Sequence, residues 1–403
     1  MDIIKRITEL SDQYEAHTLE LRHQLHCHPE LSFKEFETSA LVQRELKRIG
    51  IPFELSPVEP GVVAEIDSGK PGKFLMLRAD MDALPIQETT GLPFASENAG
   101  VMHACGHDVH TSNLLAVGEI LWNTRDQWNG RVKFVFQPGE ENGGGGRRMI
   151  EQGLMDELPD ACFALHVMPT TPGIITVGTG AMTSYSDGFW ITIHGEAAHS
   201  STPEVGTDAI QIAAAVIQAI NTISTRNIDP LDASTINIGV IRGGDAPNVI
   251  ADTVELNGMM RNASPRARDT IFKRLEEVAK GTAEMMGGTA EVRFRIGYAS
   301  VFNNKELAEF TADTYRKYED ALFGGITPDG KAPENWLHTG NQLMLSAEDF
   351  GFYTQKAPGC FIWVGTGGNV SNHNPNFRVE EPYIKFCTRA MAVFAAEFLQ
   401  QKD

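Results

Sequence analysis

Apolar and polar positions in the first part of the chain alternate between the spacing of helices and that of short buried strands. Residues 1–50 have helical spacing, interrupted by the segment HCHPELSF, where Pro29 breaks the pattern. Strand-like runs lie near residues 51–55, 61–66, 73–79, 131–137 and 161–167. Helical patterns cover about 106–122 and 145–152. This alternation predicts an α/β fold built on a mostly parallel sheet.

The order of elements changes between residues 184 and 297. The pattern predicts the order β-α-β-β-α-β, at 187–194, 206–222, 234–242, 253–261, 266–285 and 289–297. This is the order of the ferredoxin-like unit. We therefore predict a discontinuous α/β domain, 1–183 and 298–403, with a smaller domain, 184–297, inserted into it. A last helix is predicted near 382–400.

Composition narrows the classes of protein. Hydrophobic residues make up 42% of the 403 residues and charged residues 22%, which is ordinary globular usage. The 53 acidic against 34 basic residues disfavour a nucleic-acid binder, which normally presents a basic face. The five cysteines are odd in number and widely spread, so we expect no disulfide framework. No apolar run has the length of a signal peptide or membrane span, so we expect a soluble cytoplasmic protein.

Polar residues gather at the ends of the predicted strands. Sites in parallel sheets form at the carboxyl ends of the strands. Asp80, Asp82, Glu140, Glu141 and His166 all fall at or just past such ends. We therefore expect these five side chains on one edge of the sheet.

The segment HACGHDVH, residues 103–110, places several donor groups directly before a helix. Cys105, His107 and the neighbouring His103 and His110 offer thiolate and imidazole ligands for zinc and related divalent metals. The alternative is a polar loop in which Asp108 caps the helix.

Two adjacent carboxylates follow a strand in FQPGEENGGGG, residues 136–146. Because neighbouring side chains diverge, one of Glu140 and Glu141 can bind a metal while the other acts as a general base on a water molecule. A solvated turn is the alternative.

Four further motifs are weaker indications of a metal site when each is taken singly. His166 ends a strand, His373 lies in the loop SNHNPNF, Asp80 and Asp82 lie in RADMDALP, and Glu348 and Asp349 lie in SAEDFGFY. Each also fits an ordinary structural role, such as a loop histidine or a helix cap. Together with Cys105 and the two glutamates they suit a site for one or two divalent metals with open coordination positions.

The motifs RADMDALP, MHACGHDVHT, FQPGEE, LHV, GEAAHSSTP, AEDF and HNPNF occur in this order. That order resembles the M20 metallopeptidase family, in its branch of hippurate hydrolases, N-acyl-amino-acid amidohydrolases and auxin-conjugate hydrolases. The resemblance extends from about residue 20 to 385. It implies a catalytic domain with an inserted lid and dimerisation domain, and a homodimer. The segment 323–342 has no counterpart that we can match.

The resemblance also implies a site with two divalent metal ions, which are zinc, manganese, nickel or cobalt. The positions that match its metal ligands are Cys105 as a bridging thiolate, His107, Glu141, His166 and His373. Glu140 matches the general base, and Asp82 matches the acidic residue that orients a metal-bound histidine.

Three more positions match in the inserted domain. His199 matches a catalytic residue that reaches across the dimer interface to the scissile carbonyl, although a buried interface histidine is the alternative. Asn248 and Arg261 match positions linked to the substrate carboxylate, and a turn residue and a strand-edge charge are their alternatives. The members of this branch often have a glycine-rich run before the residue that His199 matches, whereas this chain has Glu196 there. This difference leaves the substrate preference open.

The expected activity is therefore that of a metal-dependent amidohydrolase that cleaves the amide bond of N-acyl amino acids. A dipeptidase or aminopeptidase on the same scaffold is the first alternative, with Glu196 or Glu348 as partner for a substrate ammonium. An inactive relative that only binds a ligand is the second. It is disfavoured because every ligand position and the base are occupied by suitable residues.

Overall fold

The computed structural model describes residues 2–368 and 370–401, which form two compact units. The larger unit contains the chain up to Met182, Val301–Gln342 and the chain from Asp349 onward. The second unit contains Thr183–Ser300 and Leu343–Glu348. The expected inserted range, 184–297, is thus slightly narrower than the observed one, and 343–348 was expected in the larger domain.

The larger unit is built around an eight-stranded sheet with the order β1-β2-β4-β3-β5-β16-β6-β15. The strands are β1 (Phe53–Leu55), β2 (Val62–Asp67), β3 (Phe74–Asp80), β4 (Arg131–Gln137), β5 (Ala161–Met168), β6 (Ile175–Gly178), β15 (Leu337–Gly340) and β16 (Gly359–Gly365). The central strands β4, β3, β5 and β16 are parallel to their neighbours in that order. A small ladder joins β7 (Gly180–Ala181) to β14 (Phe302–Asn303). The expected fold class, a mostly parallel α/β sheet, is confirmed.

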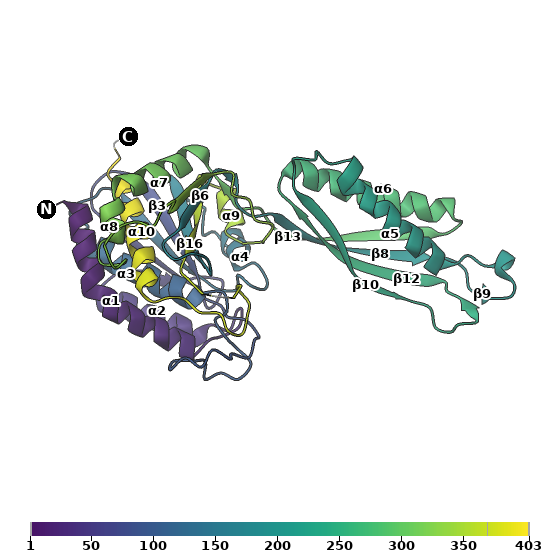
Figure 1. Cartoon of the computed structure of the whole chain (residues 1–403), viewed down its shortest axis with the longest axis horizontal. Helices are drawn as coiled ribbons and strands as arrows, with labels where there is room; N and C mark the ends of the chain where they lie inside the picture. Colours follow the sequence, from purple (N-terminus) through teal and green to yellow (C-terminus); the bar gives the residue numbers. More distant parts are fainter. Residues whose placement is uncertain (1, 369, 402–403) are drawn as a thin grey trace. The chain divides into compact units, whose positions relative to one another are not determined.

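Helices cover both faces of this sheet (Figure 1). They are α1 (Ile3–Cys27), α2 (Phe36–Ile49), α3 (His107–Asn123), α4 (Gly145–Glu151), α7 (Lys305–Lys317), α8 (Glu319–Phe323), α9 (Gly351–Thr354) and α10 (Pro382–Leu399). Leu75 and Leu77 of β3 pack in the core that contains α1, α3 and α10, whereas Met76 packs with residues of α4 and α9. Successive residues of a strand point to opposite faces of the sheet, and helices cover both faces here. The first four residues of β3, Phe74–Leu77, are therefore all apolar.

The second unit is a four-stranded antiparallel sheet with two helices. Its elements are β8 (Tyr185–His194), β9 (Ala198–His199), the 3-10 helix η1 (Pro203–Val205), α5 (Ala209–Arg226), β10 (Ser234–Gly243), β11 (Val249–Ile250), β12 (Thr253–Asn262), α6 (Pro265–Met285) and β13 (Thr289–Tyr298). The order β10-β12-β8-β13 is that of the ferredoxin-like unit, as expected. Alternate residues of β12 are buried, because α5 and α6 cover only one face of the sheet.

Two features bear on the expected class of protein. All five cysteines are free. Among the helices that the structure describes, none combines the length and apolarity that a bilayer crossing requires.

Candidate metal centre

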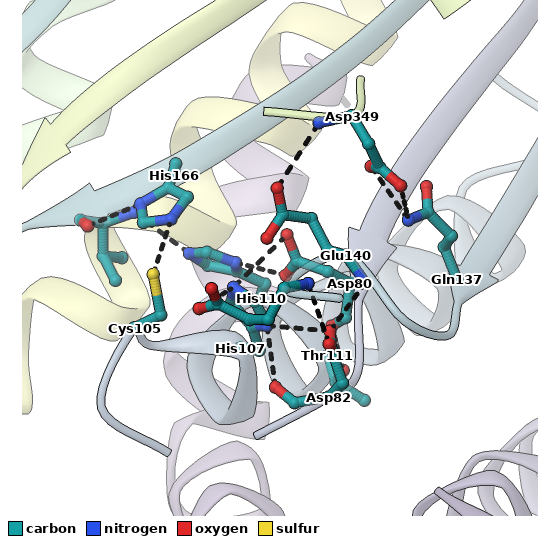
Figure 2. A network of polar contacts seen from close by, with 12 residues as sticks. Asp80, Asp82, Cys105, His107, His110, Thr111, Gln137, Glu140, His166 and Asp349 are labelled. Atoms are coloured by element: carbon teal, nitrogen blue, oxygen red, sulfur yellow. Dashed lines mark hydrogen bonds and ion pairs between the residues drawn. The ribbon is translucent and has the colours of Figure 1, made fainter. Parts of the chain in front are cut away.

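The parallel strands bring residues from distant parts of the sequence to one edge of the sheet. β4, β3, β5 and β16 are adjacent, so their carboxyl ends lie side by side. Asp80 ends β3, Glu140 and Glu141 follow β4, and His166 lies two residues before the end of β5. Helix α3 begins at the same edge with His107. Figure 2 shows the side chains of Asp80, His107, Glu140 and His166 directed toward one another.

Potential ligand atoms form overlapping groups at this edge. Cys105, His107 and His166 form one group, and the members of each group lie within 4.8 Å of one another. Cys105 also groups with Glu141 and His373, and His107 groups with Glu140 and Glu141. All five expected metal ligands and the expected base are therefore contiguous.

Main-chain carbonyls orient the two buried histidines of this group. Nδ1 of His166 lies 2.7 Å from the carbonyl oxygen of Val167, and Nδ1 of His107 lies 2.8 Å from that of Asp82. A carbonyl only accepts, so Nδ1 holds the proton in both rings. Nε2 of His166 then faces Cys105 Sγ at 3.3 Å, and the buried Nε2 of His107 has no hydrogen-bond partner among the described residues. In the neutral form of each ring, Nε2 has the lone pair that a metal requires.

Asp82 links three members of the site through one carboxylate. Its Oδ1 accepts the N–H of Glu140 at 3.0 Å, and its Oδ2 accepts the N–H of Glu141 at 2.9 Å. Oδ1 also lies 3.3 Å from Nδ1 of His107. The sequence analysis predicted that Asp82 orients a histidine, and this geometry is consistent with that role. It did not predict the contacts of Asp82 with the N–H groups of Glu140 and Glu141.

The loop after β16 supplies the last members. His373 lies 3.2 Å from Glu141, measured from Nε2 to Oε1, and its backbone has a φ of +65°, unusual for a residue with a side chain. Its N–H donates to the carbonyl oxygen of Ala104 at 2.7 Å. Nδ2 of Asn372 donates to the carbonyl oxygen of Cys105 at 3.2 Å. Sequence reasoning missed Asn372, since nothing but its place beside His373 distinguishes it.

The electrostatics of the group favour cations. Burial lowers the pKa of His107, but the carboxylates of Asp80, Asp82 and Glu141 outweigh it and raise that pKa to about 10. Burial and the charges of Glu141, Glu140 and Asp80 raise the pKa of the Cys105 thiol well above its usual value. Without a metal ion, the negative charge of the surrounding carboxylates favours the protonated forms of both groups, a histidine cation and a neutral thiol. The donor set therefore fits divalent cations.

Glu140 is buried and held by the segment that precedes α9. The N–H of Asp349 donates to Oε1 of Glu140 at 3.4 Å. The Asp349 carboxylate in turn accepts from Gln137 (Figure 2). It also accepts from Arg78 at 2.6 Å and from the N–H of Gly146. Asp349 is thus not the cap of α9, which has Phe350 as its N-cap residue and no side-chain capping bond. Through Gly146 it instead accepts an N–H from the first turn of α4.

The capping alternative for Asp108 is also wrong. Gly106 is the N-cap residue of α3, which has no side-chain capping bond. Asp108 instead accepts from Arg22 and from Nδ1 of His26, both at 2.9 Å. His103 is buried, its two ring nitrogens lack hydrogen-bond partners among the described residues, and burial lowers its pKa to about 4.

The three candidates of the inserted domain all lie in the second unit. His199 is exposed on β9, with Nδ1 2.8 Å from Oγ of Ser201. Asn248 is exposed, and Arg261 on β12 is half-buried, where burial lowers its pKa. Their roles toward the metal centre stay predictions.

Comparison with known proteins identifies relatives over the whole chain. The model of peptidase family M20/M25/M40 matches residues 76–397. An N-acetyl-L-cysteine deacetylase of Bacillus subtilis is 35% identical over 94% of this chain and 89% of its own length. Thermostable carboxypeptidase 1 of Saccharolobus solfataricus is 34% identical over 99% of both chains. The crystal structure of a Bacillus subtilis protein described as a dinuclear metal binding peptidase has 31% identity and a TM-score of 0.83, and the match covers 97% of this chain and 100% of that one.

Proposed function

Because the chain belongs to peptidase family M20/M25/M40, we propose that it hydrolyses the amide bond of N-acyl amino acids, releasing a carboxylic acid and the amino acid. The protein is a metal-dependent hydrolase of the amidohydrolase type. One observation supports the proposal. Five residues can supply metal ligands, and beside them the buried carboxylate of Glu140 is left over to act as a base.

The residues of this chain have distinct roles in the proposed reaction. Two divalent cations would be held by Cys105, His107, Glu141, His166 and His373. When bound, such cations polarise the amide carbonyl and lower the pKa of the attacking water. Glu140 takes the proton of that water and passes it to the leaving amine. The Asp349 N–H keeps Oε1 of Glu140 in place between these two transfers.

The metal is one of the softer divalent ions. Thiolate and imidazole ligands favour zinc, nickel and cobalt over magnesium or calcium, and Cys105 would be one of the residues that hold such an ion. Manganese, the fourth candidate, would rely mainly on the carboxylate of Glu141. The free thiols fit a reducing compartment, so we place the enzyme in the cytoplasm.

The proposal includes a homodimer. His199 of one subunit would stabilise the developing oxyanion in the site of the other. Its exposed position on β9 leaves the ring available to a second copy. Asn248 and Arg261 would bind the substrate carboxylate, for which Arg261 offers the matching planar fork.

Peptide hydrolysis is the second candidate, because one relative is named a carboxypeptidase. A dipeptide differs from an N-acyl amino acid by its free ammonium, which needs an acidic partner. Glu196 is exposed in the second unit and is available for that contact. Parallel assays with an N-acetyl amino acid and the matching dipeptide separate the two substrates.

The decisive experiment measures amino acid released from a panel of N-acyl amino acids. Metal-stripped enzyme is reconstituted in turn with zinc, manganese, cobalt and nickel, and Glu140→Gln is assayed beside it. We expect metal-dependent release that falls about 10²–10⁴-fold in the variant, while the variant keeps its metal. A variant that turns over normally would overturn the role of Glu140, and wild-type enzyme that releases nothing with any metal would overturn the substrate class.

A further inference from the structure

The loop between α1 and α2 contacts both segments that build the metal centre. Its Glu30 carbonyl oxygen accepts the N–H of Ala83 at 2.7 Å, and Leu31 forms a parallel bridge with Ala83. Oγ of Ser32 donates to Oδ2 of Asp82 at 2.7 Å. The segment HCHPELSF, which broke the helical pattern of the sequence, therefore lies against the acidic run after β3.

The same loop packs against the glycines around Glu140. A Cβ atom on Gly139 would lie 2.5 Å from the ring of Phe33, and one on Gly143 would lie 2.7 Å from it. Both glycines also have a positive φ, +66° and +111°. Phe33 itself has a φ of +61°, a backbone conformation that is strained for a residue with a side chain. The close fit leaves this turn little freedom to change its path.

Glu35 completes the contact with a hydrogen bond to the turn. Its side chain is fully buried, and its Oε1 accepts the N–H of Gly139 at 2.8 Å. Asp82 accepts the next two N–H groups, those of Glu140 and Glu141. Three successive N–H groups are thus held by two carboxyl groups from different parts of the chain.

We propose that Glu35 is a positioning residue for the general base: by holding the N–H of Gly139 it fixes the turn from which Glu140 projects. The inference rests on the proposed role of Glu140. Without Glu35 the N–H groups of Glu140 and Glu141 keep their bonds to Asp82, so Glu141 stays in place. The peptide group before Gly139 loses its fixed orientation, and within the limits set by the Phe33 packing the Glu140 side chain shifts by a small amount. Removal of Glu35 should therefore slow proton transfer by Glu140 and leave metal binding unchanged.

The charge state of Glu35 suits this role. Burial and the negative charge of Asp82 raise the pKa of Glu35 to about 8, so the group is mainly neutral near pH 7. A neutral carboxyl accepts the Gly139 N–H without adding charge beside Asp82 and Glu140. A glutamine offers the same acceptor oxygen at nearly the same size.

The test compares Glu35→Ala, Glu35→Gln and, as a control, Glu37→Gln, whose exposed side chain lies two residues further on, in the first turn of α2. Three quantities are measured: bound metal per subunit, kcat and KM on an N-acyl amino acid, and amide hydrogen exchange of peptides covering residues 136–146. We expect Glu35→Ala to lower kcat roughly 10- to 100-fold with KM and bound metal nearly unchanged. Exchange should speed up at Gly139, whose N–H loses its acceptor, and stay slow at Glu140 and Glu141, whose N–H groups remain bonded to Asp82. Glu35→Gln and Glu37→Gln should behave as wild type in all three.

Each other outcome counts against the proposal in a distinct way. Normal kcat and normal exchange in Glu35→Ala would remove the positioning role. Loss of metal in Glu35→Ala, or equal impairment of Glu35→Gln, would assign Glu35 to site stability instead. If wild-type enzyme releases no amino acid from any substrate, the proposed function fails, and the exchange measurement alone then decides whether Glu35 holds the turn.

Discussion

The backbone N–H of Val167 donates a hydrogen bond to Nε2 of His110 at 3.0 Å. An accepting Nε2 carries no proton, so the ring proton lies on Nδ1, which is 2.6 Å from Oδ1 of Asp80. Burial, opposed by Asp80, lowers the pKa of His110 and keeps the ring neutral. With both nitrogens engaged, His110 has no lone pair for a metal, although it lies in HACGHDVH. It ties α3 to the strand residue next to His166.

His110→Ala should therefore weaken metal binding without removing a ligand. The Val167 N–H would lose its buried acceptor and His166 its anchor, so we expect metal affinity to fall roughly 10- to 100-fold. Titration against a chromophoric chelator measures this. His338→Ala, at an exposed position on β15, is the control. Unchanged affinity in His110→Ala would show that β5 holds His166 unaided.

Arg78 is a buried guanidinium between two carboxylates. It donates to Asp80 and to Asp349, both at 2.6 Å. Arg78→Leu leaves both charges uncompensated, so we expect a loss of about 3–5 kcal/mol in the free energy of unfolding. Urea denaturation measures it. Arg147→Leu breaks only the exposed pair with Glu151 and should change the same quantity by less than about 1 kcal/mol. Equal effects of the two substitutions would contradict the compensating role.

Glu35 should make stability depend on pH. Its pKa is raised from about 4.5 to about 8 in the folded chain, so the folded state retains a proton that the unfolded state has lost. The stability that Glu35 contributes is present below about pH 4.5 and is lost as the pH rises through about 8. Glu35→Gln, which cannot ionise, should gain stability over wild type as the pH rises across that window.

Urea unfolding at several pH values measures the difference between the two chains. Glu37→Gln should show a constant difference, because its side chain is exposed. A constant difference for Glu35→Gln as well would mean that Glu35 ionises at an ordinary pKa.

Mixing two inactive variants tests whether His199 acts in the partner's site. In a dimer of His199→Ala and Glu140→Gln subunits, one site has an intact Glu140 and receives an intact His199. Random exchange makes half of the dimers mixed, each with one good site of two, so recovery should approach about a quarter of wild-type activity. Turnover of the mixture after subunit exchange is compared with that of each variant alone. No recovery despite exchange would place His199 in its own subunit's site.

Local periodicity predicted most of the elements, because their burial is regular. β3 is apolar on both faces, and β12 alternates, so strand positions could be read directly from the sequence. β15 was difficult to assign, since its four residues, LHTG, are largely exposed at the sheet edge and follow no period. The segment 343–348 shows no pattern that would have placed it with the second unit.

The donors of the centre were predictable because Cys, His and Glu at strand ends stand out chemically. Their supporting residues were not. Ser32 lies in the segment that the sequence marks only as a break, and Glu35 lies just after it. Arg78 lies within a strand whose other residues are mostly apolar. Such pairings join residues 50 to more than 200 positions apart, which no local pattern records.

The position of the second unit within the sequence sets an order for folding during synthesis. Residues 183–300 leave the ribosome as one continuous piece, with all four strands of their sheet. The larger unit then still lacks β16, which fits between β5 and β6, the packing helix α10, and His373. When residue 300 has just left the ribosome, the emerged chain thus holds a nearly finished insert and an open sheet. The candidate metal centre is therefore complete only when translation is almost finished.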